Sequence, residues 1–583
     1  MRSVLFVAFA TLLALSHGNN LSAAEPAHKR PNVIVIITDD QGYGDLGVHG
    51  NSIVRTPNID RLAAQSVELE RFHVCPVCAP TRASLLTGRY HLRTGAIDTY
   101  LGRALMDPNE TTLAEVLQSA GYRTGLFGKW HLGDDYPRRP TDQGFAEALW
   151  HRGGGIGQAA DPPGNSYFNP VLIDNNQERK VEGYCSDIFT NAAIEFIDRH
   201  RQEPFFAYLA FNCPHTPLEV ADRLIEPYRK SEFPDVEVRT PNGVRSIKTE
   251  RETTARIYAM VSNIDENVGR LLKRLHELNL QDNTIVVFLT DNGPQQPRYN
   301  AGMRDLKGTV FDGGIRVPCF VRWPARLPAG RKVSYPTAHI DMLPTLLAAC
   351  QVEPPKVKLD GINLLDQLTG DANEGPERLL FFQWHRGDRP EAGRACAIRS
   401  SRYKLLHPRG REEKDSPSDA TGMLFDLAND PGETRELAAE MPAEVERLRG
   451  AYDQWFANVT STHSYDSQRI VLGASQQPRV TLTRQDWRGP EAGWSPKSIG
   501  HWEIEVTQAG DYDLNVRFAP LANDATLTLT VQNQKLERSV AAKTESIQLG
   551  KVPLVEGPGR LEVSIAHSAG ISGATYVDVE RRD

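Results

Sequence analysis

The sequence predicts an α/β chain: a mostly parallel β-sheet flanked by helices, then a small α+β subdomain and a C-terminal β-sandwich. Continuous apolar runs at 32–38, 205–211 and 284–290 alternate with amphipathic segments, which is typical of buried parallel strands joined by helices. After about residue 461 helical periods stop, and short alternating strands separated by turn residues follow. A length of 583 residues also exceeds one ordinary domain.

Composition narrows the class of partner. The chain is 40% hydrophobic and 24% charged, as globular proteins are, and its formal net charge is −8. No long run of either charge occurs, which argues against nucleic acid as a partner. An anionic substrate would need a local basic site, because the overall charge does not attract it.

The N-terminus has the features of a secretory signal peptide. Arg2 precedes the apolar run Val4–Leu15, and the small residues at 22–24 suit cleavage after Ala24. The run is too short to cross a bilayer as an uncleaved anchor, and no later segment resembles a membrane span. We therefore expect residues 1–24 to be a signal peptide and the mature chain to be secreted or periplasmic.

The first predicted strand, Asn32–Thr38, ends in two adjacent carboxylates on a glycine-rich turn, Asp39 and Asp40. Adjacent carboxylates repel each other unless a cation lies between them. The alternative is a helix-capping aspartate beside a turn aspartate. The helices expected next are Asn58–Gln65 and Thr112–Ala120.

Two further strands lead directly into basic side chains. The strand at 122–127 is followed by Gly-Lys129-Trp-His131-Leu-Gly, and the strand at 205–211 is followed by His215. Side chains just past a strand end can face a common site. The alternatives are a surface turn with a solvated lysine and a structural histidine.

A fourth strand, Thr284–Thr290, ends in a second acidic turn, Asp291-Asn292. In an open α/β sheet such strand ends meet at one edge, where ligands bind. Carboxylate and amide oxygens suit a hard divalent cation. The sequence therefore predicts one site at this edge, with oxygen ligands from Asp39, Asp40, Asp291 and Asn292.

The remaining elements complete the expected architecture. Helices are expected at Asp187–His200, Thr253–Leu278 and His339–Cys350, and a strand at Cys319–Arg322. The subdomain is expected to contain strands at 379–384, 395–398 and 403–406 and the helix Pro442–Phe456. The loop His151-Arg152-Gly-Gly-Gly-Ile either touches substrate or is an ordinary exposed loop. In the sandwich, candidates for exposed glycan-binding aromatics are Trp487, Trp494 and Trp502, with a structural cap or an oligomer contact as the alternative.

The densest motif is Cys75-Pro-Val-Cys78-Ala-Pro80-Thr-Arg82-Ala-Ser-Leu-Leu-Thr-Gly-Arg89. Pro80 suits the first turn of a helix, which puts Cys78 at the N-terminus, where free N–H groups favour anionic chemistry. This run resembles the sulfatase signature, Cys-x-Pro-x-Arg followed by Thr-Gly-Arg, and residues 128–133 resemble the second signature of that family. A CxxC redox or zinc pair is the alternative, but no second CxxC completes such a site.

The resemblance covers roughly residues 30–460 and is to the type I, formylglycine-dependent, arylsulfatase-like enzymes of the alkaline phosphatase superfamily. It implies an alkaline-phosphatase-like fold with a catalytic domain at 25–375 and a small subdomain at 376–460, and the sandwich is expected at 466–583. It also implies that a maturation enzyme oxidises Cys78 to formylglycine and that calcium, with magnesium as the alternative, is bound.

Roles for single residues follow from the same resemblance. The implied catalytic residues are Cys78, Arg82, Lys129, His131, His215 and Lys307. The implied metal ligands are Asp39, Asp40, Cys78, Asp291 and Asn292. The expected activity is removal of sulfate from a sulfated carbohydrate. A phosphatase or phosphonate-ester hydrolase of the same superfamily and a catalytically inactive glycan-binding protein are the alternatives.

Overall fold

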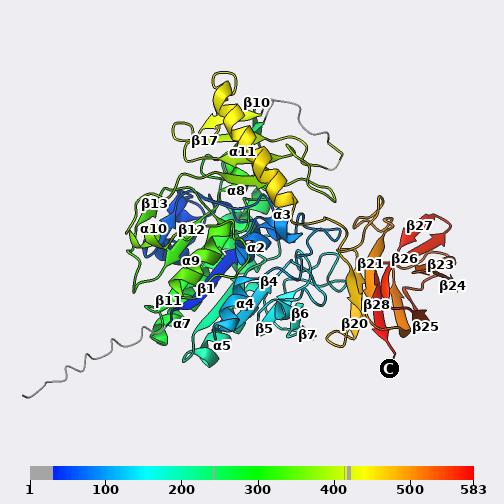
Figure 1. The fold of residues 1–583 in the computed structure, drawn as a ribbon. Helices are drawn as coiled ribbons and strands as arrows, with labels where there is room; N and C mark the ends of the chain where they lie inside the picture. Colours follow the sequence, from blue (N-terminus) through cyan, green and yellow to red (C-terminus); the bar gives the residue numbers. More distant parts are fainter. Residues whose placement is uncertain (1–29, 241–242, 413, 416–421, 583) are drawn as a thin grey trace, which may run out of the picture.

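The structure is a computed structural model that describes residues 30–240, 243–412, 414–415 and 422–582 (Figure 1). The predicted signal peptide, residues 1–24, lies outside the described residues. At the centre is a ten-stranded sheet of order β13-β2-β12-β11-β1-β8-β4-β5-β6-β7. Its strands are β1 (Asn32–Thr38), β2 (Val67–Leu69), β4 (Arg123–Lys129), β5 (Glu147–His151), β6 (Val171–Asp174), β7 (Gln177–Lys180), β8 (Phe205–Ala210), β11 (Thr284–Thr290), β12 (Cys319–Arg322) and β13 (Lys332–Val333).

The middle of this sheet is parallel. β1 pairs in parallel with β11 on one side and β8 on the other, and β4 joins β8 to β5 in the same direction. Every residue of β1, β8 and β11 is buried, which is why these strands are apolar throughout and do not alternate. The antiparallel pairs lie toward the edges, as between β11 and β12. The expectation of a mostly parallel sheet is confirmed.

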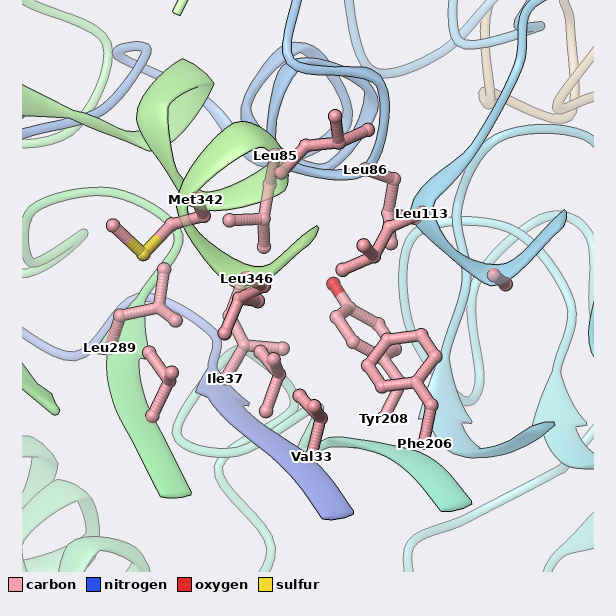
Figure 2. Close-up of a cluster of buried hydrophobic side chains, with 14 of the residues drawn as sticks. Val33, Ile37, Leu85, Leu86, Leu113, Phe206, Tyr208, Leu289, Met342 and Leu346 are labelled. Carbon is pink, nitrogen blue, oxygen red and sulfur yellow. The ribbon is translucent and has the colours of Figure 1, made fainter. Parts of the chain in front are cut away.

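Helices cover both faces of the sheet. On one face lie α2 (Cys78–Thr87), α4 (Leu113–Ser119) and α9 (Met342–Ala349), and on the other α1 (Pro57–Ala64), α5 (Cys185–His200) and α7 (Arg251–Glu277). Successive residues of β1 point to opposite faces, so Val33 and Ile37 belong to one core and Ile34 and Ile36 to the other. In Figure 2, Leu85 of α2 and Leu346 of α9 face β1, β8 and β11.

The α+β subdomain is a four-stranded antiparallel sheet packed against one long helix, α11 (Pro442–Thr460), drawn in yellow in Figure 1. Its strands are β15 (Leu380–Gln383), β16 (Cys396–Arg399), β17 (Tyr403–His407) and β18 (Met423–Asp426). The predicted strands are present with ends shifted by a residue, and the helix continues past the predicted end. The shift is expected because strand ends have no periodic signal of their own.

The C-terminal region forms two facing sheets with one shared core, the predicted sandwich (Figure 1). One sheet contains β19 (Ile470–Leu472), β21 (His501–Val506), β26 (Gly557–His567), β23 (Ala525–Val531), β24 (Gln534–Val540) and β27 (Gly570–Gly573). The other contains β20 (Arg479–Thr483), β28 (Tyr576–Arg581), β22 (Gly510–Arg517) and β25 (Ser546–Leu554). Their inner residues alternate with outward polar ones, which is the signal that predicted them.

The interpretation of the sandwich tryptophans is wrong for two of three. Trp487 and Trp502 are completely buried in the shared core, with ring centroids 5.8 Å apart. They hold the sheets together because indole rings supply large apolar surface. Trp494 alone is exposed, at 42% of its surface.

Short elements connect these layers. They are α3 (His91–Thr94), α6 (Asp222–Arg229), α8 (Asp312–Ile315), α10 (Leu365–Thr369), β3 (Phe72–His73), β9 (Val236–Thr240), β10 (Gly243–Ile247), β14 (Thr337–Ala338) and the 3₁₀ turns η1 (Gly47–His49), η2 (Pro140–Asp142) and η3 (His339–Asp341). The helix expected at His339–Cys350 is thus divided into η3 and α9. Within the described residues, we find no helix with the length and apolar character needed to cross a membrane.

Candidate active site

The carboxyl ends of four neighbouring parallel strands meet at one edge of the central sheet. Asp39 and Asp40 follow β1, Asp291 follows β11, Lys129 ends β4, and His215 lies shortly after β8. These strands are adjacent in the order β11-β1-β8-β4, so residues far apart in the sequence come together. The predicted convergence at this edge is therefore present.

Cys78 is the first residue of α2, and all ten residues of this helix are buried. Its Sγ lies 3.4 Å from Nδ1 of His131. Burial raises the pKa of the Cys78 thiol above its usual value, although the Lys129 ammonium opposes the shift. The helix starts where the sequence predicts, and it directs Cys78 at the strand ends.

Three carboxylates of the site each pair with a cationic side chain. Arg82 and Lys129 are completely buried in these pairs, and Lys307 is 15% exposed. The pairs are Arg82 Nη2 to Asp291 Oδ2 at 2.7 Å, Lys129 Nζ to Asp39 Oδ2 at 2.5 Å, and Lys307 Nζ to Asp40 Oδ1 at 2.5 Å. Removing one partner of such a pair leaves an uncompensated buried charge. The six residues therefore form one interdependent charge cluster.

The pKa values of two carboxyl groups in this cluster, Asp291 and Asp40, are shifted in opposite directions. Burial and the nearby Asp39 charge raise the pKa of Asp291 to about 6, and Arg82 offsets part of that rise. Burial also acts to raise the pKa of Asp40, but the Lys307 ammonium outweighs it, and the pKa lies well below the usual value. Asp40 therefore stays ionised over the whole physiological range.

Several oxygen atoms of the site have no partner among the described residues. They are Oδ1 of Asp39, Oδ2 of Asp40 and Oδ1 of Asn292, all of them buried. Buried polar atoms are almost always paired, so three unpaired oxygens at one place are suited to binding a cation. Two groups of three residues each have their ligand atoms within 4.8 Å of one another. The groups are Asp39-Asp40-His215 and Asp39-Cys78-Asp291. An oxygen-rich set of this kind fits a hard divalent ion.

Two histidines of the site have defined tautomers. His131 Nε2 lies 2.8 Å from the carbonyl oxygen of Thr99, so Nε2 carries the hydrogen and the Nδ1 lone pair faces Cys78. His215 Nδ1 lies 2.6 Å from the Thr216 carbonyl oxygen, which leaves the Nε2 lone pair toward Asp40. Burial lowers the pKa of His215 to about 3 and that of His131 well below its usual value.

The backbone is unusual at two of these residues. Asp40 has φ 61° and His131 has φ 63°, in the left-handed region that side chains disfavour. Such conformations cost energy and persist where the surrounding structure enforces them, commonly at functional sites. In both cases the residue is the second after a strand end, and its side chain turns into the site.

Some residues of the site were not among those predicted from the sequence. Arg298 donates to the Asp40 carbonyl oxygen at 2.8 Å and is held by Asp45, which fixes the acidic turn. Gly154 and Gly155 lie directly against the two histidines: a Cβ at Gly154 would stand 2.8 Å from His131 and one at Gly155 3.4 Å from His215. The Gly-Gly-Gly run was the available clue, because close backbone approach needs glycine.

Three residues considered from the sequence serve the site less directly. His151 is buried at the end of β5, and Arg152 pairs with Glu178 at 3.5 Å, so the glycines of this loop, not its charged residues, border the histidines. Cys75 Sγ lies near His91 and His339, at 3.3 and 3.2 Å. The seven cysteines all fall in the described ranges and are free thiols, so Cys75 and Cys78 form no redox pair here.

Comparison with known proteins identifies the family. The family model described as Sulfatase matches residues 31–352, and that described as N-sulphoglucosamine sulphohydrolase, C-terminal, matches 302–449. Arylsulfatase A of Bos taurus is 32% identical over 505 residues, which cover 76% of this chain and 90% of that protein.

Solved structures agree with this match. The structure titled Ps i-CgsB in complex with k-i-k-neocarrahexaose is 29% identical with a TM-score of 0.63, covering 76% of this chain and 95% of that one. The phosphonate monoester hydrolase of Agrobacterium radiobacter, 22% identical with a TM-score of 0.53, covers 74% of this chain and 96% of its own and shares the fold. With its family match over more than half its length, the chain belongs to the sulfatase family and is a sulfate ester hydrolase.

Proposed function

We propose that the chain is a secreted sulfatase that removes sulfate from a sulfated carbohydrate, using formylglycine formed from Cys78 and a divalent cation. The observation that carries this proposal is the 3.4 Å contact of Cys78 Sγ with the His131 Nδ1 lone pair, beside a cluster of buried carboxylates. A nucleophile activated by an adjacent base has this geometry.

Residue 78 and His131 act together in the attack on sulfur and the release of sulfate. Oxidation and hydration of the Cys78 side chain supply a geminal diol, in which one hydroxyl attacks sulfur and the other releases sulfate. His131 accepts the proton of the releasing hydroxyl at Nδ1, because Nε2 is committed to the Thr99 carbonyl. Serine has one hydroxyl and lacks the second, so it could not complete this cycle.

The cation is proposed to be calcium, with magnesium as the alternative. Asp39, Asp40, Asp291, Asn292 and the side chain at residue 78 would hold it. The unpaired oxygens of Asp39, Asp40 and Asn292 support this set. A divalent ion there supplies positive charge next to the sulfate ester. Three carboxylates and three cationic side chains already cancel, so the ion's charge is what remains to attract an anionic ester.

The leaving alcohol is proposed to depart past Lys307 and His215. Their side chains are 15% and 10% exposed, whereas Asp39, Arg82 and Lys129 are fully buried. Either can donate a proton to the leaving oxygen, Lys307 from its ammonium and His215 after taking up a proton. Lys129 and Arg82 keep the carboxylates neutralised throughout.

A carbohydrate substrate is supported by a related structure and by the predicted secretion signal. Ps i-CgsB, whose title includes a neocarrahexaose, shares 29% identity with this chain. We propose that residues 1–24 direct export and that a maturation enzyme oxidises Cys78. The proposed site residues are those expected from the sequence, and the shared strand edge supports this proposal.

Two alternatives are tested by the same assay. A phosphatase or phosphonate-ester hydrolase would have the same fold, and an inactive glycan-binding protein would retain the fold without turnover. We expect hydrolysis of 4-nitrophenyl sulfate with a higher kcat/KM than for 4-nitrophenyl phosphate or phenyl phosphonate esters. The reverse preference, or no turnover by enzyme whose Cys78 is oxidised, would reject the proposal.

Maturation and metal dependence are measured directly. Mass spectrometry of the peptide spanning residue 78 should show an aldehyde in place of the thiol when the protein is made with a maturation enzyme. Active enzyme with only cysteine at this position would refute the nucleophile. Dialysis against a chelator should abolish activity, and adding back calcium or magnesium separately should identify the ion.

A further inference from the structure

A short loop of the catalytic part is shared with the sandwich. The Gln485 carbonyl oxygen accepts from the backbone N–H of Gly102 at 3.0 Å, and its side-chain Nε2 donates to the Thr99 carbonyl at 2.9 Å. Arg488 donates to the Gly102 carbonyl at 2.6 Å. Leu101 between them is only 7% exposed and belongs to the core of the sandwich. The sandwich is therefore built onto the catalytic part through residues 99–102.

This loop reaches the candidate active site. The Thr99 carbonyl that accepts from Gln485 also accepts from His131, at 2.8 Å, and His131 in turn contacts Cys78. Three successive contacts of 3.4, 2.8 and 2.9 Å thus lead from residue 78 to a side chain of the sandwich. The sandwich loop that begins at Gln485 is part of the surroundings of the site.

Next to Thr99, two aromatic side chains lead from the loop to the protein surface. Tyr100 meets Trp494 edge-on, with ring centroids 5.7 Å apart and planes at 78°. Trp494 is one of the few large apolar side chains that the described surface exposes. Arg386 lies 4.4 Å above the Tyr100 ring and pairs with Asp98 at 2.6 Å. An exposed indole is thus in contact with a tyrosine whose own ring is held by Arg386.

Arg386 also connects Tyr100 to the part of the site that contains Lys307, where the leaving alcohol is proposed to depart. Arg386 also lies over the ring of Trp384, 4.9 Å from its centroid. Trp384 borders Gly308, the neighbour of Lys307, because a Cβ at Gly308 would stand 3.1 Å from its ring. A continuous series of contacts therefore runs from Lys307 to Trp494, with a cation between the aromatic rings.

We infer that Trp494, backed by Tyr100 and Arg386, binds the sugar ring next to the one that carries the scissile sulfate. This inference rests on the proposed function. Rings of sugars present apolar faces that pack on indole, and a guanidinium binds sulfate or hydroxyl oxygens beside them. Binding sites combine aromatic walls with a few polar groups in this way. The sandwich thereby selects oligosaccharides over single sulfated sugars.

The experiment compares two substrates in one set of variants. From a panel of sulfated oligosaccharides of carrageenan, chondroitin and heparan type, the best-hydrolysed member is measured beside 4-nitrophenyl sulfate, which has no second sugar. Trp494→Ala should lower the ratio of the two kcat/KM values about tenfold. Trp494→Phe should restore most of the ratio, and Tyr100→Leu should lower it like Trp494→Ala. Val555→Ala, at an exposed apolar residue elsewhere on the sandwich, is the matched control.

The outcomes separate this inference from the proposed function. An unchanged ratio in Trp494→Ala, with both substrates hydrolysed, would overturn the subsite and leave the sulfatase proposal intact. Hydrolysis of 4-nitrophenyl sulfate with no panel member accepted would overturn the subsite and the carbohydrate assignment together. No hydrolysis of any sulfate ester by formylglycine-containing protein would overturn the proposed function itself. A folding defect would change both rates and leave their ratio unmoved, which also counts against the subsite.

Discussion

Arg82 offers the sharpest test of the charge cluster. Its guanidinium is completely buried, donates to Asp291 Oδ2 at 2.7 and 3.1 Å, and donates to the Lys129 carbonyl at 3.0 Å. In Arg82→Met the Asp291 carboxylate stays buried without its partner, which costs about 3–5 kcal/mol of stability. Loss of this charge near the reacting sulfate should cost about 3 kcal/mol of transition-state stabilisation, or about 150-fold in kcat/KM.

Stability and activity are separated by a second substitution. Arg82→Met combined with Asp291→Asn removes both charges, so the double variant should recover most of the lost stability but none of the activity. Urea denaturation followed by circular dichroism measures the first quantity, and 4-nitrophenyl sulfate hydrolysis the second. Arg223→Met, which breaks an exposed pair with Glu266, is the control and should cost less than about 1 kcal/mol. Arg82→Met with stability and activity near those of the unaltered protein would refute the reasoning.

Three other substitutions test the nucleophile, the leaving-group acid and a buried carboxyl group. Cys78→Ser should release at most about one nitrophenol per enzyme in a burst assay, because one hydroxyl cannot both attack and expel; sustained turnover would contradict this. Lys307→Met should slow a sugar sulfate far more than 4-nitrophenyl sulfate, whose leaving group needs no proton; equal losses in kcat would exclude a leaving-group role. Burial raises the pKa of Asp161 to about 7, so its stabilising contribution is complete at acid pH and is lost as the pH rises through 7. The melting temperature of Asp161→Asn should therefore fall less between pH 5 and pH 8 than that of the unaltered protein, and parallel curves would argue against a buried, proton-bearing carboxyl.

The fold was predictable where the sequence pattern reflects burial. The apolar runs that became β1, β8 and β11 and the alternation that became the sandwich strands both follow from which faces touch water. Trp487 and Trp502 could not be placed this way, because an indole suits either a core or a glycan surface. The order of the strands in the sheet also has no local signal, and the domain divisions at 25–375, 376–460 and 466–583 remain predictions.

Some residues of the candidate site were predictable from the sequence and others were not. Charged residues at strand ends were recognisable because parallel strands end at one edge of the sheet, where ligands bind. Thr99 contributes only a backbone carbonyl to the site, and Gln485 lies 386 residues after Thr99 in the sequence, so no spacing could reveal either one. The left-handed backbone at Asp40 and His131 was not predicted either, because Asp and His adopt this conformation only at a small fraction of their positions.

The complete burial of α2 has a consequence for the order of events in the life of the chain. Cys78 keeps only 2% of its surface in contact with solvent, and the helix that carries it is pressed between the sheet and its neighbours. The active site of a second protein could not reach the Cys78 thiol in the folded structure. If Cys78 is oxidised as proposed, the oxidation must therefore take place before the polypeptide folds, and a molecule that folds with an intact thiol would remain inactive.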